Sequence, residues 1–264
     1  VGDQPVGEVG RQEPDPEASH LEIAKMAFEV SVRINRVTPI TPISLVTLAL
    51  LGSADRAVTA AETHEALRDF ITFVEARGLP VTERLELDDP AAVATALDAL
   101  VDHGVVTRWD GGTETVYAVG ADQHLAAAFY RNTIVHFFTS GAIAEVALLG
   151  SAGAADPTEA FWAEVAAMRD LLKFEFFFAE KDEFRAEVAG EVAYHDPDWE
   201  QRLATGDSDA VLGRFRPFAS HRVLRPVFEA YLLVADALVV RDFRADVDIE
   251  RLVAETLALG AQYR

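Results

Sequence analysis

Apolar residues recur at helical spacing along most of the chain. In the first segment they come every three to four residues, at Ile23, Ala27, Val30 and Ile34. This is the spacing of one face of a helix, which we predict to begin at Leu21. The segment "TPITP" ends it, because a proline disfavours helix in the residue before it. A short apolar helix, "SLVTLALLG", is predicted directly afterwards.

Two capped helices are predicted next. The first covers 59–77 and opens with the capping box formed by Thr59 and Glu62. The second opens with Asp89 as its cap, followed by a proline at the first helical position, and ends at Gly104. Two alternating runs then follow, "VVTRW" and "TVYAV", and the turn residues "DGGTE" between them predict a β-hairpin.

Three short helices and a hairpin follow one another in the order of a winged helix. We therefore predict that residues 44–119 form a compact helix–helix–helix–hairpin unit. The buried face of the third helix should consist of Val93, Leu97 and Leu100, which recur at three- and four-residue spacing. Its acidic side should face solvent or be covered by another part of the chain.

Winged helices often bind DNA through the third helix, but this one lacks the charge for it. Residues 85–107 contain no Lys or Arg, and Asp98 and Asp102 lie on the helix that would enter the groove. A helix that neutralises no phosphates has no counterion release to drive binding. The sequence therefore predicts no nucleic-acid partner, and a gel-shift assay at low salt would test a DNA-binding regulator directly.

The second half is predicted to be mainly helical. A long apolar segment covers 122–150, a capped helix begins within 156–178, and a further helix over 180–196 should lead to a short strand. After a polar stretch at 196–210, two more helices are predicted over 220–240 and 248–260.

The fold class expected is therefore mainly α with small β-hairpins (α+β), a winged-helix-like unit followed by a helical bundle. The domains expected are a linker (1–19), a helix plus the winged-helix-like unit (20–120) and a mainly helical region (121–264).

Composition narrows the function classes. The 264 residues carry a net charge of −21 and contain no cysteine, which excludes disulfides, a thiolate nucleophile and Cys-ligated metals. Such a surface repels phosphate backbones and anionic bilayers. No apolar run reaches the roughly 18 residues of a spanning helix, and no signal peptide is visible. The sequence begins with Val1 and not with Met, as a piece of a longer protein would.

The stretch "HEALRD" has the His-x-x-x-x-Asp spacing of one class of acyltransferases, in which the histidine takes a proton from a substrate hydroxyl. His64 and Asp69 lie inside the helix predicted over 59–77, however. Five residues turn about 500°, so the two side chains would point roughly 140° apart. The match is therefore predicted to be a coincidence. The other histidines lack metal-ligand spacing, and we predict no catalytic, cofactor-binding or metal-binding residue in this chain.

Three segments carry a family resemblance: "LEIAKMAFEVSVRINRVTPITPISLVTLALLG", "AAAFYRNTIVHFFTSGAIAEVAL" and "MRDLLKFEFFFAEKDEF". They resemble the C-terminal part of the PlsB-type glycerol-3-phosphate acyltransferases, from about Leu21 to the end of the chain. The most specific segment is "FYRNTIVH". The family's enzymes are peripheral proteins at the cytoplasmic face of the cell membrane.

The resemblance implies a reaction that this chain does not perform alone. In the family, the catalytic His-x-x-x-x-Asp lies upstream, in a separate acyltransferase domain. That domain transfers a fatty acyl group from acyl-CoA or acyl carrier protein to the 1-hydroxyl of glycerol 3-phosphate. The chain should be the non-catalytic half, without a cofactor, and inactive on its own. Its implied partners are the upstream domain and, through the whole enzyme, the acyl donor and the membrane surface. Docking on the catalytic domain, membrane seating and acyl-donor binding remain open as its contribution.

Within "YRNTIVH", Asn132 and His136 are four residues apart and would share a helix face. Aromatic and aliphatic neighbours, Phe129 among them, should leave little room for solvent, so both polar side chains would need partners. Three interpretations are open. The pair binds groups within this half, it contacts the catalytic domain together with Arg131, or it takes part in substrate binding.

One other function class fits the sequence. The chain could be a free-standing acidic protein-interaction module of winged-helix type. A gene that starts at a Met just before Val1 would favour this class, and an upstream acyltransferase domain would exclude it.

Overall fold

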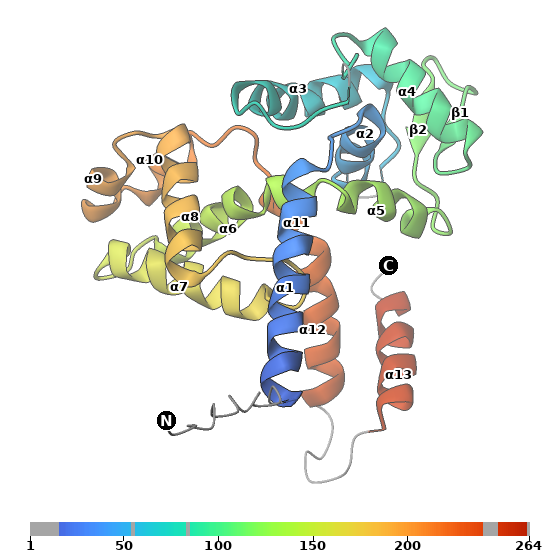
Figure 1. Ribbon diagram of the computed structural model, residues 1–264. Coiled ribbons are helices and arrows are strands. Elements are labelled where there is room, and N and C mark those ends of the chain that lie inside the picture. The colour runs from blue at the N-terminus through green and yellow to red at the C-terminus, as the bar shows by residue number, and fades with distance from the viewer. Residues whose placement is uncertain (1–15, 54–55, 83–84, 240–247, 263–264) are drawn as a thin grey trace, which may run out of the picture.

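The computed structural model describes residues 16–53, 56–82, 85–239 and 248–262 (Figure 1). Its first half contains α1 (Pro16–Val37), α2 (Pro42–Leu51), α3 (Ala60–Ala76), α4 (Pro90–Asp102), β1 (Thr107–Trp109) and β2 (Val116–Ala118). Its second half contains α5 (His124–Asn132), the 3-10 helix η1 (Val135–Phe137), α6 (Thr139–Ser151), α7 (Pro157–Leu172), α8 (Lys181–His195), α9 (Trp199–Ala204), α10 (Ser208–Leu212), α11 (Ser220–Val223), α12 (Arg225–Val239) and α13 (Ile249–Gln262).

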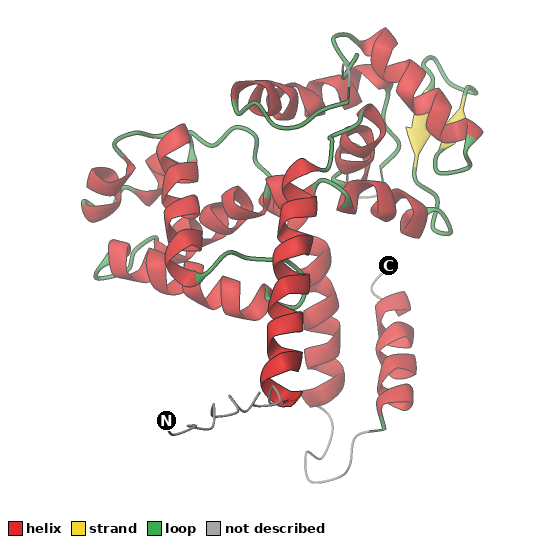
Figure 2. Cartoon of the chain, in the orientation of Figure 1, coloured by secondary structure: helices red, strands yellow, loops and turns green. Residues whose placement is uncertain are grey.

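Helices make up most of this part of the chain, and β1 and β2 form its one sheet, an antiparallel pair (Figure 2). The mainly α class with a small hairpin is therefore confirmed. The order α2, α3, α4, β1, β2 is also the expected one. That this unit is a winged helix stays a prediction that rests on the order of its elements.

The starts of α3 and α4 follow from local hydrogen bonds. The hydroxyl of Thr59 accepts from the backbone N–H of Glu62 at 3.1 Å, and the Glu62 carboxylate accepts from the N–H of Thr59 at 2.8 Å. At α4, the carboxylate of Asp89 accepts from the N–H of Ala92 at 2.8 Å. Each bond satisfies an N–H that the first helical turn leaves without a partner. Both predicted caps are confirmed.

The ends of the same helices depend on glycine. Gly104, directly after α4 and its cap residue, has a φ of +69°, which a residue without Cβ adopts at little cost. This turn lets the N–H of Val105 donate back to the carbonyl of Leu100 at 2.9 Å, as in a Schellman motif. Gly78 ends α3 in the same way, with a φ of +58°.

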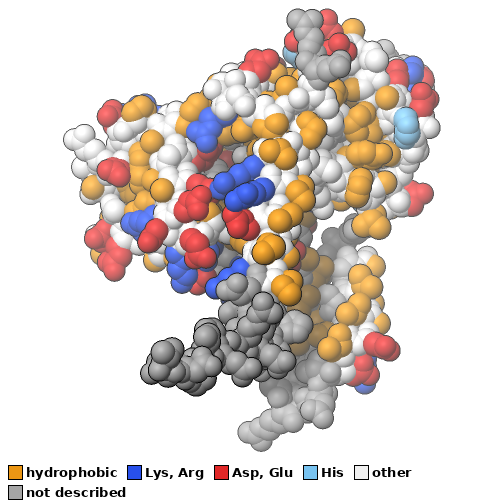
Figure 3. All heavy atoms as spheres, in the orientation of Figure 1, with side chains coloured by type: hydrophobic (Ala, Val, Ile, Leu, Met, Phe, Trp, Pro, Cys, Tyr) orange, Lys and Arg blue, Asp and Glu red, His pale blue; other side chains and the backbone are white. Residues whose placement is uncertain are grey.

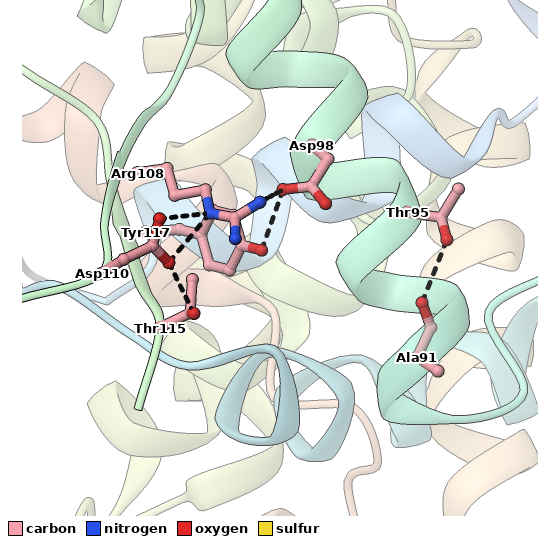
Figure 4. Close-up of polar contacts among 7 residues, drawn as sticks. All are labelled: Ala91, Thr95, Asp98, Arg108, Asp110, Thr115 and Tyr117. Atoms are coloured by element: carbon pink, nitrogen blue, oxygen red, sulfur yellow. Dashed lines mark hydrogen bonds and ion pairs between the residues drawn. The ribbon is translucent and has the colours of Figure 1, made fainter. Parts of the chain in front are cut away.

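The buried face of α4 is the predicted one. Val93, Leu97 and Leu100 are buried in the core. Asp98, whose side chain is 45% exposed, accepts hydrogen bonds from Arg108 and from the Tyr117 hydroxyl, each at 3.0 Å (Figure 4). The hairpin thus covers part of the acidic side of α4, which was one of the two arrangements expected.

Several expectations for the second half are wrong in detail. No strand follows α8 in the part that the structure describes. The Asp196 carboxylate accepts from the N–H of Asp198 at 3.1 Å, and this turn leads directly into α9. The polar stretch 196–210 contains two short helices, α9 and α10. The helix expected over 220–240 is interrupted between α11 and α12, because Pro226 cannot donate the hydrogen bond that a continuous helix needs.

The other boundaries differ less. The apolar segment 122–150 forms α5, η1 and α6, and α7 ends at Leu172, before the phenylalanine-rich segment. The first helix begins at Pro16, within the stretch expected to be a linker, and the rest of that stretch lies outside the described residues. A domain boundary near residue 120 stays a prediction. Helix α5, which follows this point in the chain, packs directly against α2, which precedes it.

The core of the second half is organised around α6. This helix packs against α7, α8, α10 and α11, and most of its residues are buried. By contrast with α6, helix α1 contributes little to the core, and α13 packs mainly on α12. In the view of Figure 1, α1, α12 and α13 extend downward, away from the unit formed by α2 to α4.

Candidate functional site

The acyltransferase-like spacing in "HEALRD" does not bring its two residues together. Both lie on the uninterrupted helix α3. The Nε2 atom of His64 lies 3.2 Å from the carbonyl oxygen of Asp88. The carboxylate of Asp69 instead lies 3.9 Å from the guanidinium groups of Arg68 and Arg216. Each side chain therefore has its own partners, as the helix geometry predicted.

His136 makes a contact within this chain. Its Nε2 lies 2.7 Å from the carbonyl oxygen of Asn35 near the end of α1. Because a carbonyl can only accept, Nε2 carries the proton and donates it. Burial lowers the pKa of this histidine below its usual value, so the neutral ring is favoured. His136 thus ties η1 to α1.

Asn132 does not have the buried position that was predicted for it beside His136. It is exposed, and its Oδ1 accepts from Arg131 at 2.8 and 3.1 Å. Helix α5 ends at Asn132 and His136 lies in η1, so the shared helix face predicted for the pair is wrong. Phe129 is 69% exposed, whereas Ile134, Val135 and Phe138 are buried, so the predicted apolar enclosure is present beside His136 and absent at Asn132. Both side chains thus have partners within this half, as the first interpretation expects, but only His136 joins segments that are far apart in the sequence.

This difference predicts unequal effects of two alanine substitutions. His136→Ala should lower the stability of the chain by about 1 kcal/mol through the lost hydrogen bond, which corresponds to roughly 2–4 °C in melting temperature for a chain of this size. Asn132→Ala is the matched control and should leave the melting temperature unchanged. Since the folded-state pKa of His136 is lowered, its contribution is present above pH 6.5 and is lost as pH falls. Thermal denaturation at pH 7.5 and pH 5 measures both effects, and equal shifts for the two variants would contradict this assignment.

Helix α6 carries one carboxylate, Glu145, which sequence patterns did not single out. It is 1% exposed and accepts from the backbone N–H groups of Ala219 and Ser220 at 2.7 and 2.9 Å. These two donors lie where α11 begins. Burial is the largest effect on the pKa of Glu145 and raises it. Glu145 therefore fixes α11 against α6.

A second buried glutamate lies beside it on α8. Glu191 is contacted by the Arg77 guanidinium at 3.1 Å and by the His195 Nε2 at 3.5 Å. Glu191 and His195, together with Glu145, border a cavity of about 10 Å³. That volume is close to one water molecule and far below the usual size of a ligand pocket. The cluster joins α3 to α6 and α8, and the cavity beside it is too small for a substrate.

A larger hollow of about 300 Å³ lies between the end of α2 and α3. Two arginines line it, but both have partners. Arg222 donates to the carbonyl of Ala49 at 2.8 Å, and Arg56 pairs with Glu62 at 2.9 Å. Burial lowers the pKa of Arg222. These contacts indicate a helix C-terminus capped by an arginine, because a cation near the last carbonyls is stabilising.

Apolar side chains gather along α1. Five positions of this helix expose between 50% and 72% of their surface, and we call them the α1 stripe: Ile23, Met26, Val30, Ile34 and Val37. At 100° per residue they fall within an arc of about 80°. Figure 3 shows hydrophobic side chains following α1 and gathering again over α13.

The C-terminal helix repeats the pattern. Ile249, Val253 and Leu257 on α13 are between 52% and 71% exposed and come every four residues, and we call them the α13 stripe. Helix α13 also packs on α12, where Gly260 approaches Leu233. Contiguous exposed apolar surface of this kind is typical of an interaction site. The two stripes are the strongest candidate for a functional surface.

The described residues cover 16–53, 56–82, 85–239 and 248–262. They contain no group of three or more His, Asp or Glu side chains that could hold a metal ion. None of their helices is both long enough and apolar enough to cross a membrane.

Known proteins are similar to this chain over almost its whole length. Residues 3–264 match the family described as the glycerol-3-phosphate acyltransferase C-terminal region. An acyltransferase of Mycobacterium bovis, plsB1, is 38% identical over 256 residues. The protein of the same name from Mycobacterium tuberculosis H37Rv matches equally well.

Coverage of these relatives is uneven. The match takes in 94% of this chain but 41% of each relative, so the chain spans less than half of the length of the proteins it resembles. The family match covers all the helices and strands described above. The chain therefore belongs to the glycerol-3-phosphate acyltransferase family and represents its C-terminal region.

Proposed function

We propose that this chain is the non-catalytic C-terminal region of a glycerol-3-phosphate 1-O-acyltransferase. The whole enzyme would transfer an acyl group from acyl-CoA or acyl carrier protein to glycerol 3-phosphate and form lysophosphatidate. The observation that carries the proposal is the family match over residues 3–264, combined with its coverage of 41% of each relative. The catalytic domain would lie in the part of the polypeptide that this match leaves out.

In this proposal the chain supports the catalytic domain and supplies no reacting group. The separate partners of His64 and Asp69 support this, since a catalytic pair needs a hydrogen bond between base and orienting carboxylate. The whole enzyme would work as a peripheral protein at the cytoplasmic face of the cell membrane. The free-standing interaction module stays the second candidate, favoured only by the order of three helices and a hairpin.

The role of "HEALRD" can be tested in the whole gene product. His64→Ala and Asp69→Ala should leave the rate of lysophosphatidate formation within about twofold of the parent enzyme, because general-base catalysis is worth roughly 10²–10⁴-fold and neither residue supplies it. The rate with acyl-CoA and glycerol 3-phosphate is the measurement. A loss of two or more orders of magnitude in both variants, with unchanged melting temperatures, would restore the pair as a catalytic dyad.

A further inference from the structure

Helix α1 attaches to the rest of the chain through a face other than its stripe. Phe28 packs edge-to-face on Phe177, with ring centroids 5.3 Å apart. The carbonyl of Asn35 accepts from His136, as described above. At 100° per residue, Phe28 and Asn35 point roughly 150° away from the centre of the α1 stripe. The helix therefore attaches through one face, and the described part of this chain leaves the α1 stripe on the other side exposed.

The charged side chains of α1 lie between these faces and are largely paired. Arg33 forms an ion pair with Glu29 on the same helix, and Arg36 lies 3.3 Å from Glu183 and 3.4 Å from Glu187 of α8. Amphipathic helices that lie on membranes usually carry a free cationic face beside the apolar one. The pairing on α1 and the net charge of −21 disfavour a lipid surface as the partner.

The similarity to longer acyltransferases favours a partner that belongs to the same polypeptide. The part matched in the relatives is their C-terminal region and covers 41% of their length, so most of each relative precedes it. A domain that precedes this chain would be connected through the start of α1. Its high effective concentration favours contact with α1 over association between separate molecules. In Figure 1, the start of α1 lies at the same end of the molecule as the start of α13.

We infer that the α1 and α13 stripes form the surface on which the preceding acyltransferase domain docks. The inference rests on the proposed function and adds the location of the contact. Docking would bury the two apolar stripes, which the described part of this chain leaves exposed. Loss of the contact should make both helices less stable while the core around α6 stays intact.

Hydrogen–deuterium exchange tests this inference. The amides of α1 and α13 should exchange at least about tenfold more slowly in the whole gene product than in residues 1–264 alone, because docking suppresses local opening. Those of α4 should exchange equally in both and serve as the internal control. In the whole gene product, the double variant Val30→Asp/Ile34→Asp should restore fast exchange of α1 and lower the acyltransferase rate. Leu149→Asp, at an exposed leucine of α6, is the matched control and should do neither.

The other possible results overturn either the docking surface or the proposed function. Equal exchange of α1 and α13 in both proteins, with an active whole enzyme, overturns the docking surface and leaves the proposed function standing. Absence of an acyltransferase domain from the gene product overturns the proposed function itself. Protection that requires phosphatidylglycerol vesicles would assign the stripes to the membrane. Protection in residues 1–264 alone together with a doubled mass would assign them to a second copy. Both would overturn the inference.

Discussion

Glu145→Ala should lower the free energy of unfolding of this chain by about 3–5 kcal/mol. The carboxylate is buried and accepts the N–H groups of Ala219 and Ser220. Alanine would leave two buried donors without partners, at roughly 1–3 kcal/mol each, and would add a small cavity. Urea denaturation followed by circular dichroism measures the change. Glu75→Ala, at an exposed glutamate of α3, should change the stability by less than about 0.5 kcal/mol.

The isosteric variant Glu145→Gln separates the charge from the hydrogen bonds. It keeps one acceptor oxygen, so its loss at pH 7 should be clearly smaller than that of alanine. Burial raises the pKa of Glu145 in the folded chain. The stabilising contribution of its protonated form is therefore present below the unfolded value of about 4.5 and is lost as pH rises through the folded pKa. Relative to the glutamine variant, the parent should lose stability over this interval. If the unfolding free energies of the parent and of Glu145→Gln differed by the same amount from pH 4 to pH 7, the raised pKa of Glu145 would be contradicted.

Asp196→Ala should lower the free energy of unfolding by about 2–3 kcal/mol, less than Glu145→Ala. Asp196 is fully buried, and its Oδ2 lies 2.9 Å from Arg202 and 3.4 Å from Arg214. The Nε of Arg202 does not form an aligned hydrogen bond with this oxygen, so the contact is chiefly electrostatic. The side chains of Arg202 and Arg214 are 32% and 46% exposed, so water would compensate their charges in part. The cost would come chiefly from the lost contacts of the buried carboxylate and from the N–H of Asp198 left without its acceptor.

Two variants make this prediction specific. Asp196→Asn keeps an oxygen for the N–H of Asp198 but loses the charge, so its cost should fall between those of the parent and alanine. Asp102→Ala removes an exposed carboxylate from α4 and should change the stability little. Unfolding by urea at pH 7 measures all three variants. Equal stabilities of Asp196→Ala and Asp102→Ala would show that the buried ion pair does not stabilise the fold.

The parts of the fold that could be predicted from sequence are those determined by neighbouring residues. The cap of α3 is a contact between Thr59 and Glu62, and the buried face of α4 follows from the spacing of its aliphatic residues. Local patterns also identified the hairpin. In the segment 122–150, apolar residues occur on all sides, so periodicity could not show where α5 ends and α6 begins.

The buried polar contacts depend on residues far apart in the chain. Glu145 lies 74 residues from Ala219, and no spacing rule connects an acid within an apolar helix to the N–H groups of another helix. His136 lies 101 residues from Asn35, so the sequence indicated that it needed a partner without showing which one.

The exposure of the α1 stripe could not be predicted from the sequence either. The pattern of Ile23, Ala27, Val30 and Ile34 correctly located an apolar face on the first helix. It could not show that nothing in the described part of this chain covers that face. Periodicity reports which side chains share a face, whereas burial depends on what packs against it.

In the proposed function, this chain is one region of an acyltransferase whose chemistry is performed elsewhere in the polypeptide. The most direct measurement is the formation of lysophosphatidate from acyl-CoA and glycerol 3-phosphate, by residues 1–264 and by the whole gene product side by side. We expect product from the whole protein and none from residues 1–264. Turnover by residues 1–264 that disappears in His64→Ala would contradict the account and place the reaction within this chain.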